Sequence, residues 1–574
     1  MAATVGSTPT DVNAVSVSPF PGTLDASPTT QISFLGASGT RVSDVVAVGS
    51  ASGTHAGKLK RYSTGTGESF LPQTRFVPGE SVRVTAKVIT AGHAATVRTN
   101  FTIAFNAPVP QAAFPKHRGS PHAVQHYLSA PALTPSAVQI TTPPKPGAAP
   151  GDLFLAPYEG TGRPGPMIVD QTGQLVWFHP LPAGESATNL HPQTYRNKKV
   201  LTWWQGHILK IGFGQGEDEI YDTSYRPIAT VSAGNGYHAD LHEFRLTPQG
   251  TAWIDAFDPV YVNLSSVGGL RHGVLTDSVV EEIDVKTGLV MWEWHALGHI
   301  PLRDSYTPVP HIPSHYWDFV HINSIDPGPD GQLLLSSRST STIFDVDMRS
   351  GGFRWRIGGK YSSFNRGPGT FFFYQHDATW EPGGLVSVFD NGATPPREAQ
   401  SRGLLLDPNT QTKAVTLVKA YINPNKTLLA TSQGSLTKLS NGNWLMGYGG
   451  LPNFTEYDSS GDVLLDGTLG HNVQNYRTYL AHWSGHPTTR PKIAAQAAGG
   501  TATVNASWNG ATRVAAWQVL GGADKRSLTP IATTPTSGFE TAIAIHSSPT
   551  YVAVAALDAA GHRLSTSHAI ALSD

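Results

Sequence analysis

Two short sequence phrases alternate along the middle of the chain, and this alternation constrains the fold more than any other feature. The first phrase is an apolar residue followed by Asp, a short turn that often contains Gly, and an apolar strand that ends near Trp. It is clearest in IVDQTGQLVWF around Asp170, EIDVKTGLVMWEW around Asp284 and DVDMRSGGFRWRI around Asp347, with looser copies around Asp222, Asp407 and Asp458. Each copy predicts two strands joined by a turn, in which Asp accepts hydrogen bonds from the turn amides and Gly supplies a positive φ.

The second phrase precedes most of these hairpins and begins with His. The His is followed by a short apolar strand, a turn with Gly and Pro or Asn, and another apolar strand. Copies begin at His242 (HEFRLTPQGTAWI), His321 (HINSIDPGPDGQLLL) and His376 (HDATWEPGGLVSV), with a fainter copy at His191. A fifth copy, SQGSLTKLSNGNWLM, carries Gly434 where the others carry His, and GDLFLAPY at 151–158 is a half-copy.

Six hairpins, each preceded by a full or partial strand pair, predict six four-stranded units. A period of roughly 50–60 residues is typical of a β-propeller. We therefore expect an all-β fold with a six-bladed β-propeller at its centre, closed by pairing the strand around 475–483 with the chain near 151. A set of separate sandwiches is the alternative, but it does not explain why two distinct phrases alternate in order.

Sequence patterns outside the repeats predict β-sandwich domains on both sides of the propeller. Residues 1–106 contain alternating runs such as SVRVTAKVI and predict an immunoglobulin-like sandwich, whereas 107–150 is rich in Pro and Ala and predicts a linker. The propeller is expected over 151–487. The segment 488–574 resembles a fibronectin type III sandwich through its turn spacing and the aromatic residues Trp508, Trp517 and Tyr551.

Composition excludes several classes of function. Charged residues make up 14% of the chain and the formal net charge is −1, so no basic surface for nucleic acid is expected. The absence of Cys excludes disulfides, thiolate metal sites and a cysteine nucleophile. No apolar run reaches the roughly 20 residues that a membrane span needs. Abundant Gly, Pro, Ser and Thr favour a secreted protein, and we expect MAATVGSTPT to be a start Met on a chain whose signal peptide has been removed.

The repeated histidines are the strongest candidates for chemistry. In a propeller the first strand of each blade faces the central channel, so His191, His242, His321 and His376 are expected to converge at one mouth. Such a cluster suits a site that handles protons or an anion, or one that binds a transition metal. Arg338, on the strand after His321, and Asn323, expected on the same side of its strand as His321, favour an anion because a guanidinium repels a metal ion.

At this point the motifs resemble the arylsulfotransferase family, whose members use aryl sulfate esters and not a nucleotide as the donor. The resemblance rests on HEFRLTP, DFVHINSID followed by SSRS, QHDATWEPGG, QGSLTKLSNGNWLMGYG and NYRTYLAHWSGHP, and it covers about 150–490. It implies a six-bladed propeller that moves a sulfuryl group from a phenolic sulfate ester to a phenolic acceptor, by a ping-pong mechanism through a sulfohistidine. It implies no metal or other cofactor, and only small-molecule partners.

The resemblance also assigns roles to particular residues. His376 matches the nucleophile, His242 and His321 match the assisting histidines, and Arg338, accompanied by Asn323, matches the arginine that holds the sulfuryl oxygens. The faint copy at His191 is not assigned a role. Five aromatic residues could hold the phenol ring: Tyr158, Trp203, Trp204, Phe389 and Tyr448. Because the chain lacks Cys and is rich in Gly and Pro, it is closest to a secreted branch of the family.

Two other functions stay open at the level of sequence. A non-catalytic secreted propeller could bind a carbohydrate or cell-wall partner, in which case Arg338 would point away from the channel. A lyase or hydrolase with a metal ion held by histidines would contain stoichiometric zinc, iron or copper.

Overall fold

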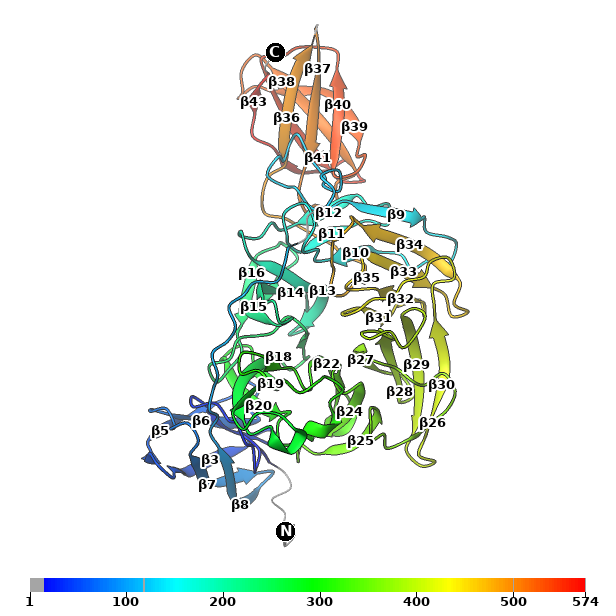
Figure 1. Ribbon diagram of the computed structural model, residues 1–574. Coiled ribbons are helices and arrows are strands. Elements are labelled where there is room, and N and C mark those ends of the chain that lie inside the picture. The colour runs from blue at the N-terminus through cyan, green and yellow to red at the C-terminus, as the bar shows by residue number, and fades with distance from the viewer. Residues whose placement is uncertain (1–14, 117–118, 499, 573–574) are drawn as a thin grey trace.

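The computed structural model describes residues 15–116, 119–498 and 500–572 (Figure 1). Within these ranges the fold is all-β, as expected, with 43 strands and no α-helix. The helical turns there are three short 3-10 segments: η1 (Ser265–Val267), η2 (Leu302–Asp304) and η3 (Pro329–Gly331). No helix in these ranges is long and apolar enough to cross a membrane.

Two four-stranded sheets form the N-terminal part of the fold. Their strand orders are β1-β2-β6-β5 and β4-β3-β7-β8, and their apolar faces share one core that includes Phe34, Val84 and Phe101. In β7 exposed and buried residues alternate strictly, which is the pattern read from SVRVTAKVI. The strands are β1 (Ser16–Ser18), β2 (Ile32–Leu35), β3 (Arg41–Gly49), β4 (Gly53–His55), β5 (Gly57–Arg61), β6 (Gly67–Pro72), β7 (Ser81–Thr90) and β8 (His93–Thr102).

Six further sheets follow between residues 152 and 481, and Figure 1 shows them around a common centre. The first contains β10 (Asp152–Leu155), β11 (Met167–Val169), β12 (Leu175–Phe178) and β35 (Tyr479–Ala481). The second contains β13 (Ser186–Tyr195), β14 (Lys198–Ile208), β15 (Gly214–Tyr221) and β16 (Pro227–Val231). The third contains β17 (Phe244–Leu246), β18 (Thr251–Val262), β19 (Gly273–Asp284) and β20 (Leu289–His295), with β21 (Tyr316–Trp317) parallel to β19.

The remaining three of these sheets have the same meander of antiparallel strands. The fourth contains β22 (Ile322–Pro327), β23 (Gln332–Ser337), β24 (Thr342–Asp347) and β25 (Phe353–Gly358). The fifth contains β27 (His376–Glu381), β28 (Leu385–Asp390), β29 (Arg402–Asn409) and β30 (Ala414–Tyr421), with β26 (Asn365–Arg366) beside β30. The sixth contains β31 (Ser435–Lys438), β32 (Trp444–Gly447), β33 (Asn453–Tyr457) and β34 (Val463–Leu469), with β9 (Val138–Thr142) beside β34.

Each of the six sheets contacts the next, and the sixth contacts the first through β32 and β35. The closing strand is the one expected from the sequence, because β35 pairs with β10 in the register Asp152↔Ala481. The segment 107–150, expected to be a linker, contributes β9 to the outer edge of the sixth sheet, where Gln139 pairs with Thr468. The chain before the first sheet therefore also helps to build the last one.

The turn chemistry read from the Asp phrase is present in most copies. The carboxylate of Asp170 accepts hydrogen bonds from the amides of Thr172 (2.8 Å) and Gln174 (3.0 Å). Equivalent bonds are made by Asp222, Asp284, Asp347 and Asp458. In the copy around Asp407 the turn amides are bonded instead by the side chain of Asn409. The turn Asp therefore fixes the hairpin in five of the six copies.

Two sheets also form the C-terminal part, around a core that includes Val504, Trp517 and Val554. Trp508 packs against the edge of this core, and Tyr551 is half-buried at the start of its strand. The strands are β36 (Lys492–Ala498), β37 (Thr501–Ser507), β38 (Ala516–Gly522), β39 (Thr529–Pro535), β40 (Glu540–Ile545), β41 (Tyr551–Leu557), β42 (Arg563–Thr566) and β43 (Ile570–Ala571).

Candidate active site

A cavity of about 220 Å³ lies where the inner strands of the third, fourth and fifth sheets approach one another. His242 precedes β17, His321 precedes β22 and His376 begins β27. The three histidines that line the cavity therefore come from the same position in three copies of the repeat. The other residues that line it are Phe114, Tyr158, Ile208, Lys210, Ile211, Gly212, Leu241, Asp318, Arg338, Ser432 and Gln433. The structure thus brings His242, His321, His376 and Arg338 to one cavity.

His376 is held in a single tautomer by Asn391, at the end of β28. The Asn391 amide nitrogen donates to the carbonyl oxygens of Ala430 (3.1 Å) and Gln433 (2.9 Å), so its oxygen is the acceptor that faces His376. The Nδ1 of His376 lies 2.7 Å from this oxygen and must carry the proton. The lone pair is therefore on Nε2, where it accepts a hydrogen bond from the backbone N–H of Gln433 at 3.1 Å.

The electrostatic environment keeps the His376 imidazole neutral. Burial is the main cause that lowers the pKa of His376 well below its usual 6.5, and the positive charge of Arg338 lowers it further. The side chain is 1% exposed, and its ring centroid lies 6.4 Å from that of His321. A neutral imidazole with a defined lone pair is a nucleophile.

His242 and His321 form a hydrogen-bonded pair. Their Nε2 atoms are 3.1 Å apart, and each Nδ1 faces a carboxylate: Asp240 for His242, and Asp318 at 2.7 Å for His321. If both Nδ1 atoms donate to these carboxylates, the two Nε2 lone pairs would face each other and repel, so a proton must lie between them. A proton shared in this way would lie beside His376, and burial, which lowers the pKa of His242, would favour its release.

Arg338 supplies positive charge to the same cavity. Its guanidinium stacks over the ring of Tyr374 with the carbon 5.4 Å from the ring centroid, and it donates a long hydrogen bond of 3.5 Å to the carbonyl of Thr431. Within the described part of the chain it forms no ion pair with a carboxylate. Lys210, which the sequence patterns did not single out, is an exposed second cation at the cavity wall. A guanidinium without a carboxylate partner is suited to an oxyanion.

Comparison with known proteins connects this cavity to a family. The family model described as Arylsulfotransferase (ASST) matches residues 191–470. Residues 191–470 match the arylsulfotransferase family. The three cavity histidines and Arg338 lie inside the matched arylsulfotransferase region, whereas Tyr158 lies before it. No curated protein matches the chain.

Solved structures of low identity also resemble the chain. A protein of unknown function from Bacteroides caccae is 15% identical with a TM-score of 0.35, over 57% of this chain and 98% of that one. A catalytically inactive virginiamycin B lyase from Staphylococcus aureus, solved with quinupristin, is 11% identical with a TM-score of 0.28, over 64% of this chain and 95% of that one. Hsv2 from Kluyveromyces lactis is 8% identical with a TM-score of 0.24, over 60% of this chain and 96% of that one.

Asn323 does not line this cavity. Its side chain is fully buried, and its amide nitrogen donates to the carbonyl of Gln375 at 2.8 Å. The expected alternation fails because His321 has a φ of +57° and lies outside the strand, which begins at Ile322, and because the register shifts between Ile322 and Ser324. Asn323 therefore supports the segment that carries His376 and does not face the cavity.

Four of the five aromatic residues named from the sequence lie in hydrophobic cores, and one lines the cavity. Trp203, Trp204, Phe389 and Tyr448 are each 0% exposed and absent from the cavity wall. Tyr158 is the residue at the wall, where its hydroxyl donates to the Oε1 of Gln474 at 3.3 Å. Apolar side chains in central strands usually pack between neighbouring sheets, and these four do so.

His191 lies at a different opening. It lines a second cavity of about 530 Å³, and its ring stacks on Tyr479 with centroids 4.4 Å apart. Its Nδ1 donates to the carbonyl of Asn189 (2.8 Å), and burial lowers its pKa to about 4. The expectation that four histidines converge at one mouth therefore fails for His191, because β13 has a bulge between Thr188 and His191 that changes the direction of its side chains.

The acidic residues that follow two of the histidines point to this second cavity. Glu243 and Asp377 line it, whereas the preceding His242 and His376 line the first. Both acidic residues contact the buried Arg477, which the sequence reasoning missed and which comes just before β35. No repeat phrase contains it, although it lies within NYRTYLAHWSGHP, one of the motifs that carry the family resemblance.

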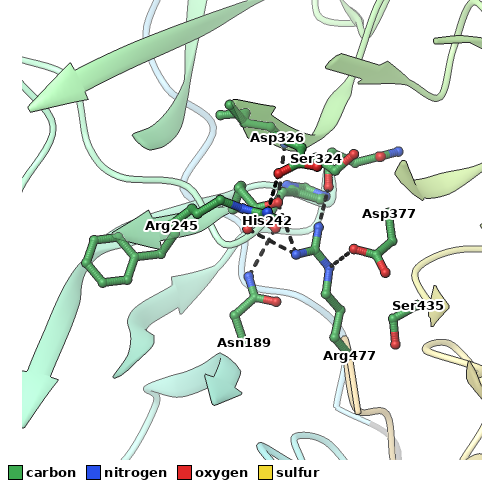
Figure 2. Close-up of polar contacts among 12 residues, drawn as sticks. Asn189, His242, Arg245, Ser324, Asp326, Asp377, Ser435 and Arg477 are labelled. Atoms are coloured by element: carbon green, nitrogen blue, oxygen red, sulfur yellow. Dashed lines mark hydrogen bonds and ion pairs between the residues drawn. The ribbon is translucent and has the colours of Figure 1, made fainter. Parts of the chain in front are cut away.

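Arg477 joins three sheets at the centre of the fold. Its Nη1 is 3.1 Å from the Oε1 of Glu243, its Nε is 3.3 Å from the Oδ1 of Asp377, and its Nη2 donates to the carbonyl of Asn323 at 2.9 Å. Figure 2 shows Arg477 reaching Asp377, with Arg245 and Asp326 paired nearby. Because Glu243 and Asp377 directly follow His242 and His376 in the chain, these contacts hold the backbone next to both histidines.

Two residues of the candidate cavity, His321 and Gln433, and two neighbours of His376 have backbone conformations that are uncommon outside Gly. His321, Tyr374, Asp377 and Gln433 have φ values of +57°, +56°, +57° and +64°. Such residues persist only where the surrounding structure enforces them, and they are concentrated at functional sites. Here they aim the histidines and the Gln433 amide into one volume.

Proposed function

We propose that the protein is an aryl-sulfate sulfotransferase that moves a sulfuryl group from a phenolic sulfate ester to a phenolic acceptor through a sulfohistidine at His376. One observation carries the proposal: the Nε2 lone pair of a neutral His376 lies in the same cavity as the unpaired guanidinium of Arg338. The match to the arylsulfotransferase family supports the reaction class.

In the first half-reaction the Nε2 of His376 attacks the sulfur of the donor. A bond forms between nitrogen and sulfur while the bond between sulfur and the aryl oxygen breaks, and the phenolate leaves with the electron pair. The proton held between His242 and His321 neutralises this phenolate. The contact between Gln433 N–H and Nε2 must open for the attack, which frees that N–H to bond a sulfuryl oxygen.

In the second half-reaction the acceptor phenol gives its proton to the His242–His321 pair. The phenol oxygen attacks sulfur, and the bond between sulfur and the Nε2 of His376 breaks. Both steps need in-line positioning and charge stabilisation at the sulfuryl oxygens, by analogy with phosphoryl transfer. Arg338 is placed to supply that stabilisation, and Lys210 adds charge at the wall.

We also propose that the six central sheets are the blades of one propeller over 151–487, flanked by an immunoglobulin-like sandwich over 1–106 and a fibronectin type III-like sandwich over 488–574. The cyclic contacts between consecutive sheets support this interpretation. The composition favours secretion, so we propose an extracellular donor and acceptor.

The decisive experiment measures the intact mass of the protein after incubation with nitrophenyl sulfate alone. We expect a gain of one sulfuryl group, which peptide mapping assigns to the peptide with His376, and nitrophenol release that an added phenol accelerates. His376→Ala should abolish both, whereas the matched variant His191→Ala, at the second cavity, should retain both.

Transfer at the parental rate by His376→Ala, or a stable mass gain on another residue, would reject the assignment of the nucleophile. Unaltered near-ultraviolet circular dichroism of His376→Ala is the control that its fold is intact.

A second candidate function is a metal-dependent lyase or hydrolase. Asp240, His242 and Asp255 place one ligand atom each within 4.8 Å of one another, which favours this alternative. It predicts that a chelator abolishes turnover and that no sulfuryl group is ever found on the protein.

A further inference from the structure

A separate group of buried ionisable side chains lies where the N-terminal sheets contact the third central sheet. Asp25 comes from the loop between β1 and β2, Asp277 from β19, and His295 from the end of β20. They are 2%, 0% and 1% exposed. Strands β1, β2 and β6 contact β20, so this group is enclosed between two parts of the chain that are far apart in sequence.

The geometry of the group is that of metal ligands. The Nδ1 of His295 is 3.2 Å from the Oδ1 of Asp25 and 3.2 Å from the Oδ2 of Asp277. One ligand atom from each of the three residues lies within 4.8 Å of the others. Two ligands bound at about 2.1 Å with a tetrahedral angle are roughly 3.4 Å apart, so these separations fit one small cation.

Some polar atoms in and around this group have no hydrogen-bond partner among the described residues. Neither carboxylate oxygen of Asp25 accepts a hydrogen bond, although the residue is almost fully buried. Among the described residues, the Oε1 of the fully buried Glu281 and the hydroxyl of Tyr237 also lack a hydrogen-bond partner. Burial, and after it the charge of Glu293, raises the pKa of both groups. Buried carboxylates without donors are stable when a cation binds them.

Outer contacts orient two of the three residues, His295 and Asp277, as they do in known classes of metal site. The Nε2 of His295 faces the Oε1 of Glu293 at 3.2 Å, which leaves Nδ1 as the ligand atom. The backbone N–H of Leu297 donates to the Oδ1 of Asp277 at 2.7 Å, which leaves Oδ2 directed at His295. A carboxylate that accepts from the second nitrogen of a ligating His is the usual support of a zinc ligand.

We propose that Asp25, Asp277 and His295 bind one divalent transition metal ion, with zinc as the best fit, and that this ion ties the N-terminal sheets to β19 and β20. The imidazole ligand and the short ligand separations favour zinc over calcium and magnesium, which prefer six or more oxygen ligands. The site is distinct from the proposed sulfuryl-transfer cavity, and its role is structural.

The test measures metal content and stability together. The full-length protein is stripped with a chelator, dialysed, and titrated with Zn²⁺ or Co²⁺, with metal measured by mass spectrometry of the elements. We expect one metal ion per chain, a visible Co²⁺ spectrum of the intense tetrahedral type, and a rise in the Tm of the stripped protein on adding Zn²⁺. Asp25→Asn should reduce bound zinc at least tenfold and abolish the rise in Tm.

Asp284→Asn is the matched control. The Asp284 carboxylate also joins the N-terminal part to β19, through the backbone N–H (2.6 Å) and hydroxyl (2.7 Å) of Ser63, but it lies outside the group. Asp284→Asn should keep its zinc. If Asp25→Asn does not fold, Asp277→Asn and the Co²⁺ spectrum of the unaltered protein provide the same test.

Failure of the stripped parent protein to bind either ion would overturn the proposal. Equal zinc in Asp25→Asn and parent would also overturn it and would direct attention to Asp240, His242 and Asp255. Loss of zinc from both Asp25→Asn and Asp284→Asn would contradict it too, since binding would then depend on docking of the sheets and not on the Asp25 ligand. None of these readouts uses sulfuryl transfer, so the outcome is independent of the proposed function.

Discussion

At the scale of single residues, the orientation of one amide decides the chemistry of His376. Two carbonyl groups fix the Asn391 nitrogen, and this leaves its oxygen to hold the proton of His376 on Nδ1. Burial and Arg338 then keep the ring neutral. The proposed nucleophile is therefore held in a neutral, single tautomer by neighbours that are not themselves expected to react.

Arg338→Ala is expected to reduce kcat/KM for sulfuryl transfer by about 10²–10³-fold, because a preorganised charge at the oxyanion is lost. It should also change the pH profile. Arg338 lowers the pKa of His376, so its removal raises that pKa, and protonation then blocks the lone pair at higher pH than in the parent. The acid limb of kcat/KM against pH should move upward.

Arg338→Lys is the control for this prediction. It keeps the positive charge, so the acid limb should stay at the parental pH, but it loses the bidentate contact of a guanidinium with the sulfuryl oxygens. An acid limb at the parental position in Arg338→Ala would show that the guanidinium does not act on His376.

The sequence identified part of the site because that part follows the repeat. His242, His321, His376 and Arg338 were found from their position in the phrases and from the family resemblance. Asn323 was misplaced because strand alternation does not extend through the positive φ of His321. Asn391, Asp240 and Asp318 were missed because nothing in the pattern relates them to the histidines that they orient.

At the scale of elements, the structure explains why one copy of the His phrase has Gly434 where the others have His. Gly434 has a φ of +106°, and a Cβ at this position would lie 2.4 Å from Cε1 of Phe389. Phe389 pairs with His376 across β27 and β28. The copy in the sixth sheet therefore has Gly in place of His because the backbone passes too close to Phe389, on β28, to leave room for a side chain.

Gly434→Ala should lower the free energy of unfolding by about 2–5 kcal/mol, since it combines a strained φ with a clash in a packed core. Thermal or urea unfolding measures this change. Gly442→Ala is the matched control, because Gly442 has a φ of +92° but no atom within 4 Å of an added Cβ, and about 1–2 kcal/mol is expected. Equal losses in the two variants would show that packing against Phe389 is unimportant.

The hairpins and the closing strand could be predicted from sequence because both depend on local patterns. Asp–turn–Gly phrases set the hairpins, and the half-copy at 151–158 implied a missing partner strand. The strand β9 was not predicted, since the segment VQITT is short and only partly buried and its pairing with β34 is a long-range contact. The bulge in β13 that redirects His191 is likewise set by the tertiary structure.

At the scale of the whole molecule, Arg477 connects the sheets that carry His242, Asn323 and Asp377. Its two carboxylate partners, Glu243 and Asp377, have side chains that are 2% and 7% exposed. A buried charge network of this kind is retained because removing one member leaves the others unpaired.

Arg477→Met is expected to lower the free energy of unfolding by about 3–5 kcal/mol, because Glu243 and Asp377 lose a buried counter-charge. Arg354→Met is the matched control: Arg354 pairs with Asp347 on the surface, with side chains 33% and 30% exposed, and a loss below about 1 kcal/mol is expected. Urea unfolding followed by tryptophan fluorescence compares the two. A loss below 1 kcal/mol for Arg477→Met would contradict a central role.

The pairing of β10 with β35 has a consequence for how the protein is made. A ribosome releases residues in order, so the first central sheet must wait for its fourth strand until almost the entire ring has been synthesised. Arg477 emerges with that strand. Until then Glu243 and Asp377 lack the guanidinium with which they form ion pairs in the folded protein. The last segment of the ring to leave the ribosome therefore supplies both the closing strand β35 and the guanidinium that pairs with Glu243 and Asp377. The proposed active site can form only after this segment has been synthesised.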